Sequence, residues 1–330
     1  MSTQTHEFER SRKIPVTVIT GYLGSGKTTL LNHILKRQDE RRVAVIVNEF
    51  GDVSIDGQII EHEGNEELIE FNNGCLCCTV RGDLIDTIGK LRERSNQLDA
   101  IMIETTGLAD PAPVASTFFV SEEIRNDTRL DAFITMVDAV NLEKNLEQSV
   151  EAQEQVAFAD IVIVNKTDLV TEEQLTRVER KVRVLNPIAR LMRSEHSVVD
   201  LSQILDVNVF QLDAKLQVDP EFLNEHDHEH DPTITSVVLH EWRPIDINRF
   251  MSWMAPLLQT EGDRYLRTKG VFYAQGFNER VLFQSVRMLT TMTRCDPWKA
   301  DEQRSTEYVV IGRDLDPEML ADGLAGCIVR

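Results

Sequence analysis

The chain has 330 residues, of which 42% are hydrophobic and 27% charged, enough for one large core and a second, smaller one. Its 55 acidic residues outnumber 35 lysines and arginines, which gives a formal net charge of -20. This charge repels nucleic-acid phosphates and anionic lipid, and no uninterrupted apolar stretch approaches the ~20 residues of a membrane-spanning helix. We therefore expect a cytosolic protein that binds neither nucleic acid nor membrane.

The N-terminal part shows a regular alternation of elements. Residues 1–12 are polar and read as a flexible tail, and from Lys13 onward apolar runs alternate with helical patterns such as 28–38 and 171–186. Apolar runs separated by helices indicate parallel strands that are covered on both faces. We predict a doubly wound, mostly parallel α/β domain over residues 13–208, with strands at 14–20, 43–48, 68–71, 100–104, 132–138 and 161–165.

The first predicted strand leads into GYLGSGKTT. Gly21, Gly26, Lys27 and Thr28 fit the spacing G-x-x-x-x-G-K-[ST] between a strand and a helix, which is the context of a phosphate-binding loop. Glycines there let backbone N–H groups converge on phosphate oxygens at a helix N-terminus. We expect Lys27 to reach the β and γ phosphates and Thr28 to supply a hydroxyl to Mg²⁺.

The second predicted strand ends at NEFGD, residues 48–52. Its Glu49 and Asp52 are candidates for organising Mg²⁺-bound water or for holding a second metal. A solvated turn is the alternative interpretation, and it applies more to Asp52 than to Glu49.

Three of the five cysteines follow the third predicted strand, at Cys75, Cys77 and Cys78. In a reducing compartment, clustered thiols indicate metal binding or redox chemistry and not a disulfide framework. Thiolates are soft donors, so we expect Zn²⁺, with Co²⁺, Ni²⁺ or Cu⁺ as alternatives and an oxygen or nitrogen ligand, such as Glu49 or Asp52, completing the site. A redox-active cysteine pair and a closed structural zinc site are the alternatives.

Two further strands end in residues suited to nucleotide. IETTGLADP, residues 103–111, offers Glu104 as a carboxylate on the Mg²⁺ side and the N–H of Gly107 as a γ-phosphate contact. NKTD, residues 165–168, offers Asp168 to accept hydrogen bonds from guanine N1–H and its 2-amino group, donors that adenine lacks. The sequence therefore predicts GTP, with Asn165 holding the loop and the Lys166 stem covering the base.

Beyond residue 208 the pattern changes. Residues 209–233 are acidic, contain two prolines together with His226, His228 and His230, and read as a linker. Residues 234–330 carry four strand-like stretches, at 234–242, 270–276, 280–286 and 306–312, and helical patterns at 246–259 and 315–325. We predict a smaller α+β domain there.

Five motifs occur along the N-terminal part in this order: GYLGSGKTT, NEFGD, GCLCCTVRGDL, IETTGLADP and NKTD. Together they resemble the CobW family of P-loop GTPases, which are relatives of nickel-insertion GTPases. The C-terminal part is similar to that family's second domain at KGVFYAQG, RVLFQSV and STEYVVIGRDL. The resemblance implies slow GTP hydrolysis coupled to delivery of zinc or cobalt to a client. It also implies three sets of site residues: phosphate binding by Gly24, Gly26, Lys27, Thr28 and Thr29, guanine recognition by Asn165, Lys166 and Asp168, and metal binding by Cys75, Cys77 and Cys78. Ser25 of the same loop is a further candidate for nucleotide binding.

Our hypothesis is a metallochaperone that binds and slowly hydrolyses GTP. Lys27, Thr28 and Glu104 are the candidate catalytic residues, acting by positioning and charge stabilisation. The C-terminal domain would dock a client metalloprotein or a second copy of the chain. A thiol redox protein, and a signalling GTPase with a structural zinc, are the alternatives.

Overall fold

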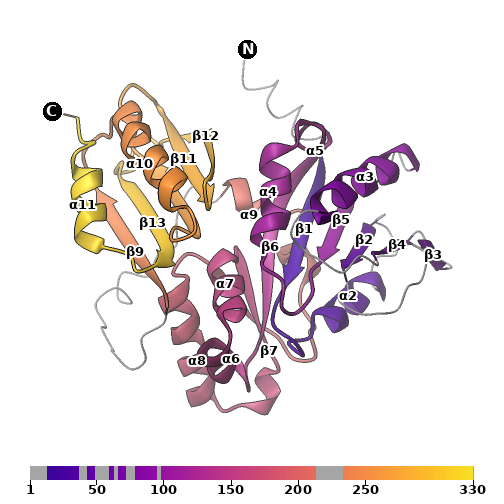
Figure 1. The fold of residues 1–330 in the computed structure, drawn as a ribbon. Helices are drawn as coiled ribbons and strands as arrows, with labels where there is room; N and C mark the ends of the chain where they lie inside the picture. Colours follow the sequence, from indigo (N-terminus) through magenta and orange to yellow (C-terminus); the bar gives the residue numbers. More distant parts are fainter. Residues whose placement is uncertain are drawn as a thin grey trace.

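A computed structural model describes residues 13–36, 43–48, 59–62, 66–71, 79–94, 98–212 and 233–329. These residues form two sheets, each with its own helices (Figure 1). Among the described residues, no helix is long and apolar enough to cross a membrane.

The first sheet has eight strands in the order β3-β4-β2-β5-β1-β6-β7-β8. Only β3 is antiparallel to its neighbour, so the predicted mostly parallel sheet is confirmed. β1 lies between β5 and β6. The strands are β1 (Ile14–Thr20), β2 (Val43–Asn48), β3 (Ile59–His62), β4 (Glu66–Phe71), β5 (Ala100–Glu104), β6 (Thr128–Asp138), β7 (Ile161–Asn165) and β8 (Arg190–Arg193).

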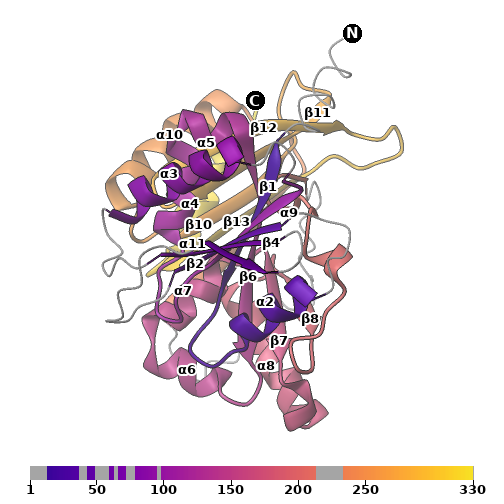
Figure 2. The ribbon, with the colours of Figure 1, turned by 90° about the vertical axis from the view of Figure 1, so that its right-hand side faces the viewer.

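Helices cover both faces of this sheet (Figure 2). One face packs against α3 to α8, and the other against α2 and the chain that follows β8. The helix boundaries follow local chemistry: α8 begins with a capping box in which Thr171 and Gln174 satisfy each other's backbone N–H. The helices are α2 (Lys27–Lys36), α3 (Thr79–Arg94), α4 (Ala112–Val120), α5 (Glu122–Asp127), α6 (Leu142–Gln148), α7 (Val150–Phe158), α8 (Glu172–Leu185) and α9 (Val209–Leu212), with 3₁₀ turns η1 (Thr167–Leu169) and η2 (Leu201–Gln203).

The second sheet is antiparallel, with the order β12-β11-β10-β13-β9. Its core is aromatic, because Phe250 of α10 stacks at 4.5 Å from Phe272, 5.0 Å from Phe283 and 5.4 Å from Tyr308, measured between ring centroids. The predicted α+β domain is therefore confirmed. Its elements are β9 (Ile234–Glu241), α10 (Ile247–Glu261), β10 (Arg267–Phe272), β11 (Glu279–Val286), β12 (Leu289–Pro297), β13 (Thr306–Arg313) and α11 (Pro317–Ala325).

The two domains are held together by a buried ion pair and a shared apolar cluster. Arg267 of β10 donates to the Asp160 carboxylate and to the Phe158 carbonyl oxygen, and its side chain and that of Asp160 are each 1% exposed. The cluster joins residues of α4, α7 and α8 to Val286, Val309 and Ile311 of the second sheet and to Leu266, which directly precedes β10. The domains therefore share part of their core.

The structure differs from the sequence prediction in a few elements. β3, β8 and β12 were not predicted, because β3 and β8 are short and polar and β12 is largely exposed. The segment expected to be a linker from Val209 begins with α9, where Val209 and Phe210 are buried. Residues 213–232, with the three linker histidines, lie outside the described residues, so the linker stays a prediction.

Candidate nucleotide-binding site

The loop between β1 and α2 has the backbone of a phosphate cradle. Gly21, Gly24 and Gly26 all adopt positive φ angles, of 142°, 75° and 108°. A Cβ at Gly26 would lie 2.4 Å from Asn165 Nδ2 and 2.7 Å from Ser197 Oγ, so only glycine fits there. Open space surrounds Gly24, and Thr28 and Thr29 at the start of α2 are exposed. The loop can thus present its N–H groups to a ligand.

Four hydroxyls along the ends of β1 and β5 fit a polar ligand. They belong to Thr20, Ser25, Thr105 and Thr106, and each is buried without a hydrogen-bond partner in the described protein. Buried hydroxyls are rarely left unpaired in folded proteins, since desolvation costs free energy. Phosphate oxygens, or water held by them, would supply the missing partners.

Lys27 and Glu104 provide opposite charges at this edge. Lys27 Nζ donates to the carbonyl oxygens of Gly21, at 2.8 Å, and Tyr22, at 3.5 Å, and Lys27 is only 8% exposed. Burial lowers the pKa of Lys27 below its usual value, while the Glu104 carboxylate acts in the opposite direction. Thr28 Oγ1 donates to Glu104 Oε1 at 3.1 Å. This hydroxyl and carboxylate are oxygen donors of the kind that Mg²⁺ prefers.

The turn at Gly107 touches the phosphate loop directly. A Cβ on Gly107 would lie 2.9 Å from the Leu23 backbone nitrogen and 2.5 Å from its side chain. Gln155 of α7 holds the turn from behind, because its Nε2 donates to the carbonyl oxygens of Gly107, at 3.1 Å, and Ala109, at 3.2 Å. Gly107 therefore lies beside the phosphate loop, and its contact with the γ phosphate stays a prediction. Gln155 was not predicted as a site residue, because it lies within a helix and belongs to no recognisable motif.

Asn165 joins the phosphate loop to the chain after β8. Its Nδ2 donates to the Ser25 carbonyl oxygen at 2.9 Å, and its Oδ1 accepts from Ser194 Oγ and from the Ser197 N–H, both at 2.9 Å. Ser197 Oγ in turn donates to the carbonyl oxygen of Gly26 at 3.1 Å. The predicted loop-holding role thus has a geometric basis. Ser194 and Ser197 were not predicted, and the positive φ of His196 and Ser197 could not be read from the sequence.

Lys166 and Asp168 directly follow the end of β7, at the same edge of the sheet as the phosphate loop. Lys166 adopts the left-handed conformation, and its Nζ donates to Asp138 Oδ2 at 2.8 Å. Burial acts to raise the pKa of Asp138, but hydrogen bonds from Lys166, Asn141 and the Val140 N–H outweigh it, so that pKa lies below its usual value. The carboxylate therefore stays charged and fixes Lys166. Asp168 is partly exposed, with Oδ2 4.0 Å from His196 Nε2, and is accessible to a base.

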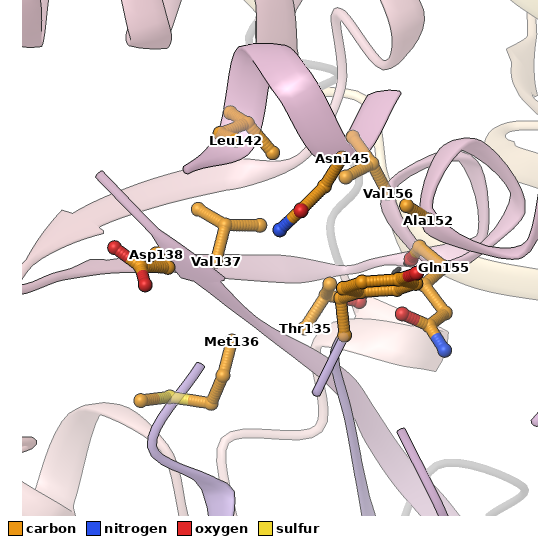
Figure 3. Close-up of a pocket in the computed structure, with 10 residues that line it drawn as sticks. Thr135, Met136, Val137, Asp138, Leu142, Asn145, Ala152, Gln155 and Val156 are labelled. Carbon is orange, nitrogen blue, oxygen red and sulfur yellow. Dashed lines mark hydrogen bonds between the residues drawn. The ribbon is translucent and has the colours of Figure 1, made fainter. Parts of the chain in front are cut away.

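A small pocket lies behind the phosphate loop, between β6 and the helices α6 and α7. Figure 3 shows Asp138 and Gln155 near opposite ends of it, with Val137 between them. Tyr22 of the phosphate loop also lines it. Its walls are mainly the apolar side chains that support the ends of β6 and α7, so we interpret it as a gap in the supporting layer.

The predicted metal ligands Cys75, Cys77, Cys78 and Glu49 lie outside the described residues, as does Asp52. Among the residues that are described, no cluster of three or more His, Cys, Asp or Glu side chains could hold a metal ion. The thiolate site stays a prediction.

Comparisons with known proteins identify both parts of the chain. Residues 15–193 match the CobW/HypB/UreG nucleotide-binding domain, and residues 234–328 match the cobalamin synthesis protein CobW C-terminal domain. The chain is 36% identical to the zinc chaperone YjiA of Escherichia coli over 318 residues, covering 95% of this chain and 98% of YjiA. It is 34% identical to the zinc chaperone CobW of Pseudomonas aeruginosa over 348 residues, covering 94% of this chain and 91% of that one.

A solved structure has the same fold over almost its whole length. The crystal structure of Zn(II)-bound YjiA GTPase from E. coli superposes with a TM-score of 0.80 at 33% identity, covering 96% of this chain and 99% of that one. Both domains and their arrangement are thus shared with a protein of known structure.

Proposed function

Because this chain belongs to the CobW/HypB/UreG family of P-loop GTPases, we propose that it is a GTP-dependent zinc metallochaperone. It binds GTP at the sheet edge described above, hydrolyses it slowly to GDP and phosphate, and passes zinc to a client protein. The observation that carries the proposal is similarity along nearly the whole chain to proteins named zinc chaperones. The phosphate loop, Glu104 and the NKTD residues on one edge support the nucleotide part.

In this proposal the described residues bind and position the triphosphate. Lys27 exchanges its carbonyl partners for phosphate oxygens, and the Gly107 N–H is directed to the γ phosphate. Mg²⁺, when bound, would neutralise phosphate charge, and Thr28 and Glu104 are the residues that would hold it. Asp168 accepts from the guanine N1–H and 2-amino groups. Because no arginine among the described residues is assigned to the transferred phosphate, hydrolysis is expected to be slow.

The sheet register supports a link between nucleotide and cargo. Val47 of β2 is paired with Glu104 of β5, and the next residue, Asn48, is paired with Phe71 of β4. β2, which precedes Glu49 in the chain, thus lies next to β5 and Glu104, and β4, which precedes the three cysteines, lies one strand further out. A change at the Mg²⁺ side would therefore have to pass one strand spacing to reach the Glu49 segment and two to reach the segment that carries the cysteines.

The C-terminal domain is expected to dock the client metalloprotein or a second copy of this chain. Its sheet presents β12 as one edge strand and β9 as the other, and the exposed residues of β12 are available for docking.

A competition titration with a zinc chelator tests the proposal. Reduced protein is titrated in the apo form, with a non-hydrolysable GTP analogue and Mg²⁺, and with GDP and Mg²⁺. We expect one zinc equivalent whose affinity is higher with the analogue than with GDP, and whose binding is lost in Cys77→Ser. Cys295→Ser is the matched control, because Cys295 lies on β12 of the other domain.

If the zinc affinity is the same with the GTP analogue and with GDP, the metallochaperone function is contradicted, even if GTP is hydrolysed. Equal loss of zinc in Cys77→Ser and Cys295→Ser would contradict the thiolate assignment.

A further inference from the structure

Three consecutive residues of α7 connect the Gly107 turn to the C-terminal domain. Gln153, Glu154 and Gln155 are all buried, with exposures of 8%, 7% and 1%. Gln155 holds the turn through two carbonyl oxygens, as described above. Glu154 Oε1 accepts from Arg313 Nη2 of β13 at 2.7 Å, and Gln153 Oε1 accepts from Thr233 Oγ1 at 2.8 Å. Residues 153–155 of α7 thus contact both the Gly107 turn and the chain of the second domain.

Arg287 makes a second connection to the same turn. It lies in the two-residue loop between β11 and β12, whose ends are paired at Val286 and Leu289. Its Nη2 is 2.7 Å from Asp110 Oδ2 and 3.7 Å from Glu154 Oε1. Asp110 follows Gly107 by three positions, and its Oδ1 accepts from the Ala112 N–H at the start of α4. A closed ring therefore runs from the turn through Gln155, Glu154 and Arg287 and back through Asp110.

The backbone of Arg287 is unusual for an arginine. Its φ is 49°, in the left-handed region where two-residue hairpin loops usually have glycine or asparagine. A strained residue persists where the surrounding structure fixes it, and such residues concentrate at functional sites. Here the side chain reaches across the domain boundary to Asp110, which glycine could not do.

We propose that Arg287 is a positioning residue that makes the Gly107 turn depend on the C-terminal domain. The inference rests on the proposed GTPase function. We call Asp110, Glu154, Gln155, Arg287 and Arg313 the interdomain clasp. Because the turn is placed to contact the γ phosphate, the clasp strengthens binding of GTP and its hydrolysis, and leaves GDP binding unaffected. By linkage, GTP also tightens the domain contact, so nucleotide state reaches the surface where a client would dock.

Arg287→Gly tests this without disturbing the hairpin, because glycine favours the positive φ that Arg287 adopts. We expect GDP affinity to stay within about twofold of wild type, while affinity for a non-hydrolysable GTP analogue and kcat each fall about three- to tenfold, in the lower part of the range of coupling between contacting residues. Asp110→Asn keeps the acceptor for the Ala112 N–H and should give the same loss. The double variant should lose no more than either single variant.

Asp263→Asn is the matched control. Asp263 is a third carboxylate near Arg287, 3.3 Å away, but its side chain is 87% exposed and belongs to the C-terminal domain. Its loss should leave the ratio of analogue to GDP affinity unchanged.

Hydrogen exchange supplies a readout other than activity. In wild type, the amides of the β11–β12 hairpin should exchange more slowly with the GTP analogue than with GDP, and Asp110→Asn should abolish that difference. Equal loss of GDP and analogue affinity in Arg287→Gly would overturn the inference, as would an effect of Asp263→Asn equal to that of Asp110→Asn. If wild type neither binds nor hydrolyses GTP, the proposed function itself fails; if it does both and the analogue-to-GDP ratio of Arg287→Gly is unchanged, only this inference fails.

Discussion

Thr28 and Glu104 are 76 positions apart in the sequence, yet Thr28 Oγ1 donates to Glu104 Oε1 at 3.1 Å. The contact exists because β1 and β5 are parallel neighbours, with Ile19 paired to Glu104, and both strands end at the same edge. A hydroxyl at the start of α2 and a carboxylate at the end of β5 are therefore brought together by sheet register. Their position beside Lys27 gives the first prediction.

Glu104→Gln should lower GTP hydrolysis by ~10²-fold or more while preserving the fold. The amide retains the acceptor for Thr28 Oγ1 but loses the charge that supports a Mg²⁺ site. Phosphate release measured against Mg²⁺ concentration should show a shifted or absent dependence. Asn32→Ala, at an exposed position further along the same helix, is the control. An unchanged Mg²⁺ dependence in Glu104→Gln would rule out the role assigned to this carboxylate.

Nucleotide affinity should fall as pH rises through the alkaline range below 10.5, the ordinary pKa of lysine. Burial lowers the pKa of Lys27 in the free protein, so the side chain loses its proton in that range. A bound phosphate favours the ammonium form and raises the pKa again, so binding takes up a proton there. Calorimetry in buffers of different ionisation enthalpy measures this uptake.

Lys27→Arg is the control for proton uptake, since a guanidinium stays protonated while all other titrating groups are kept. Uptake of equal size in wild type and Lys27→Arg would assign the pH dependence to another group.

Asp168→Asn should weaken GTP binding by about 10²-fold or more and improve binding of xanthosine triphosphate, since an asparagine can donate to the oxygen that xanthine has in place of the 2-amino group. Competition between the two nucleotides measures the exchange of preference. His196→Gln serves as the comparison: the His196 side chain is 81% exposed and 4.0 Å from Asp168, and we expect its loss to change affinity less than twofold. Retained GTP preference in Asp168→Asn would remove the guanine assignment.

Arg267→Met should destabilise the protein by ~3–5 kcal/mol, because Asp160 would remain as a buried charge without its arginine. Asp160→Asn keeps the acceptor for the Phe133 N–H, so the double variant should be less destabilised than the sum of the two single variants. Urea denaturation gives these values, and the shared core predicts a single transition. Additive effects would indicate that the two residues do not act as a pair.

The sequence was most informative where local chemistry determines structure. The phosphate loop requires glycines at fixed spacing, and the apolar runs predict the central strands. Lys27, Glu104 and Asn165 could therefore be assigned to one edge of the sheet from the sequence alone. Contacts that depend on packing between elements gave no such signal. Gln155 reaches the Gly107 turn because α7 lies behind it, and Ser197 reaches Gly26 because the chain after β8 curves back. The exposed edge strand β12 lacks the alternation that would have identified it.

The apolar cluster that spans the domain boundary has a practical consequence for dissecting this protein into fragments. Residues 15–193 and 234–328 are separate units by sequence comparison, yet Phe210 between them packs against Phe119 and Phe133, and Lys269 of the second sheet donates to the Val209 carbonyl oxygen. A recombinant nucleotide domain ending at residue 193 would expose the apolar surfaces of α4, α7 and α8 and leave Asp160 without its arginine. Such a fragment should aggregate, so loss of GTPase activity on truncation would reflect an exposed core and not a missing catalytic group.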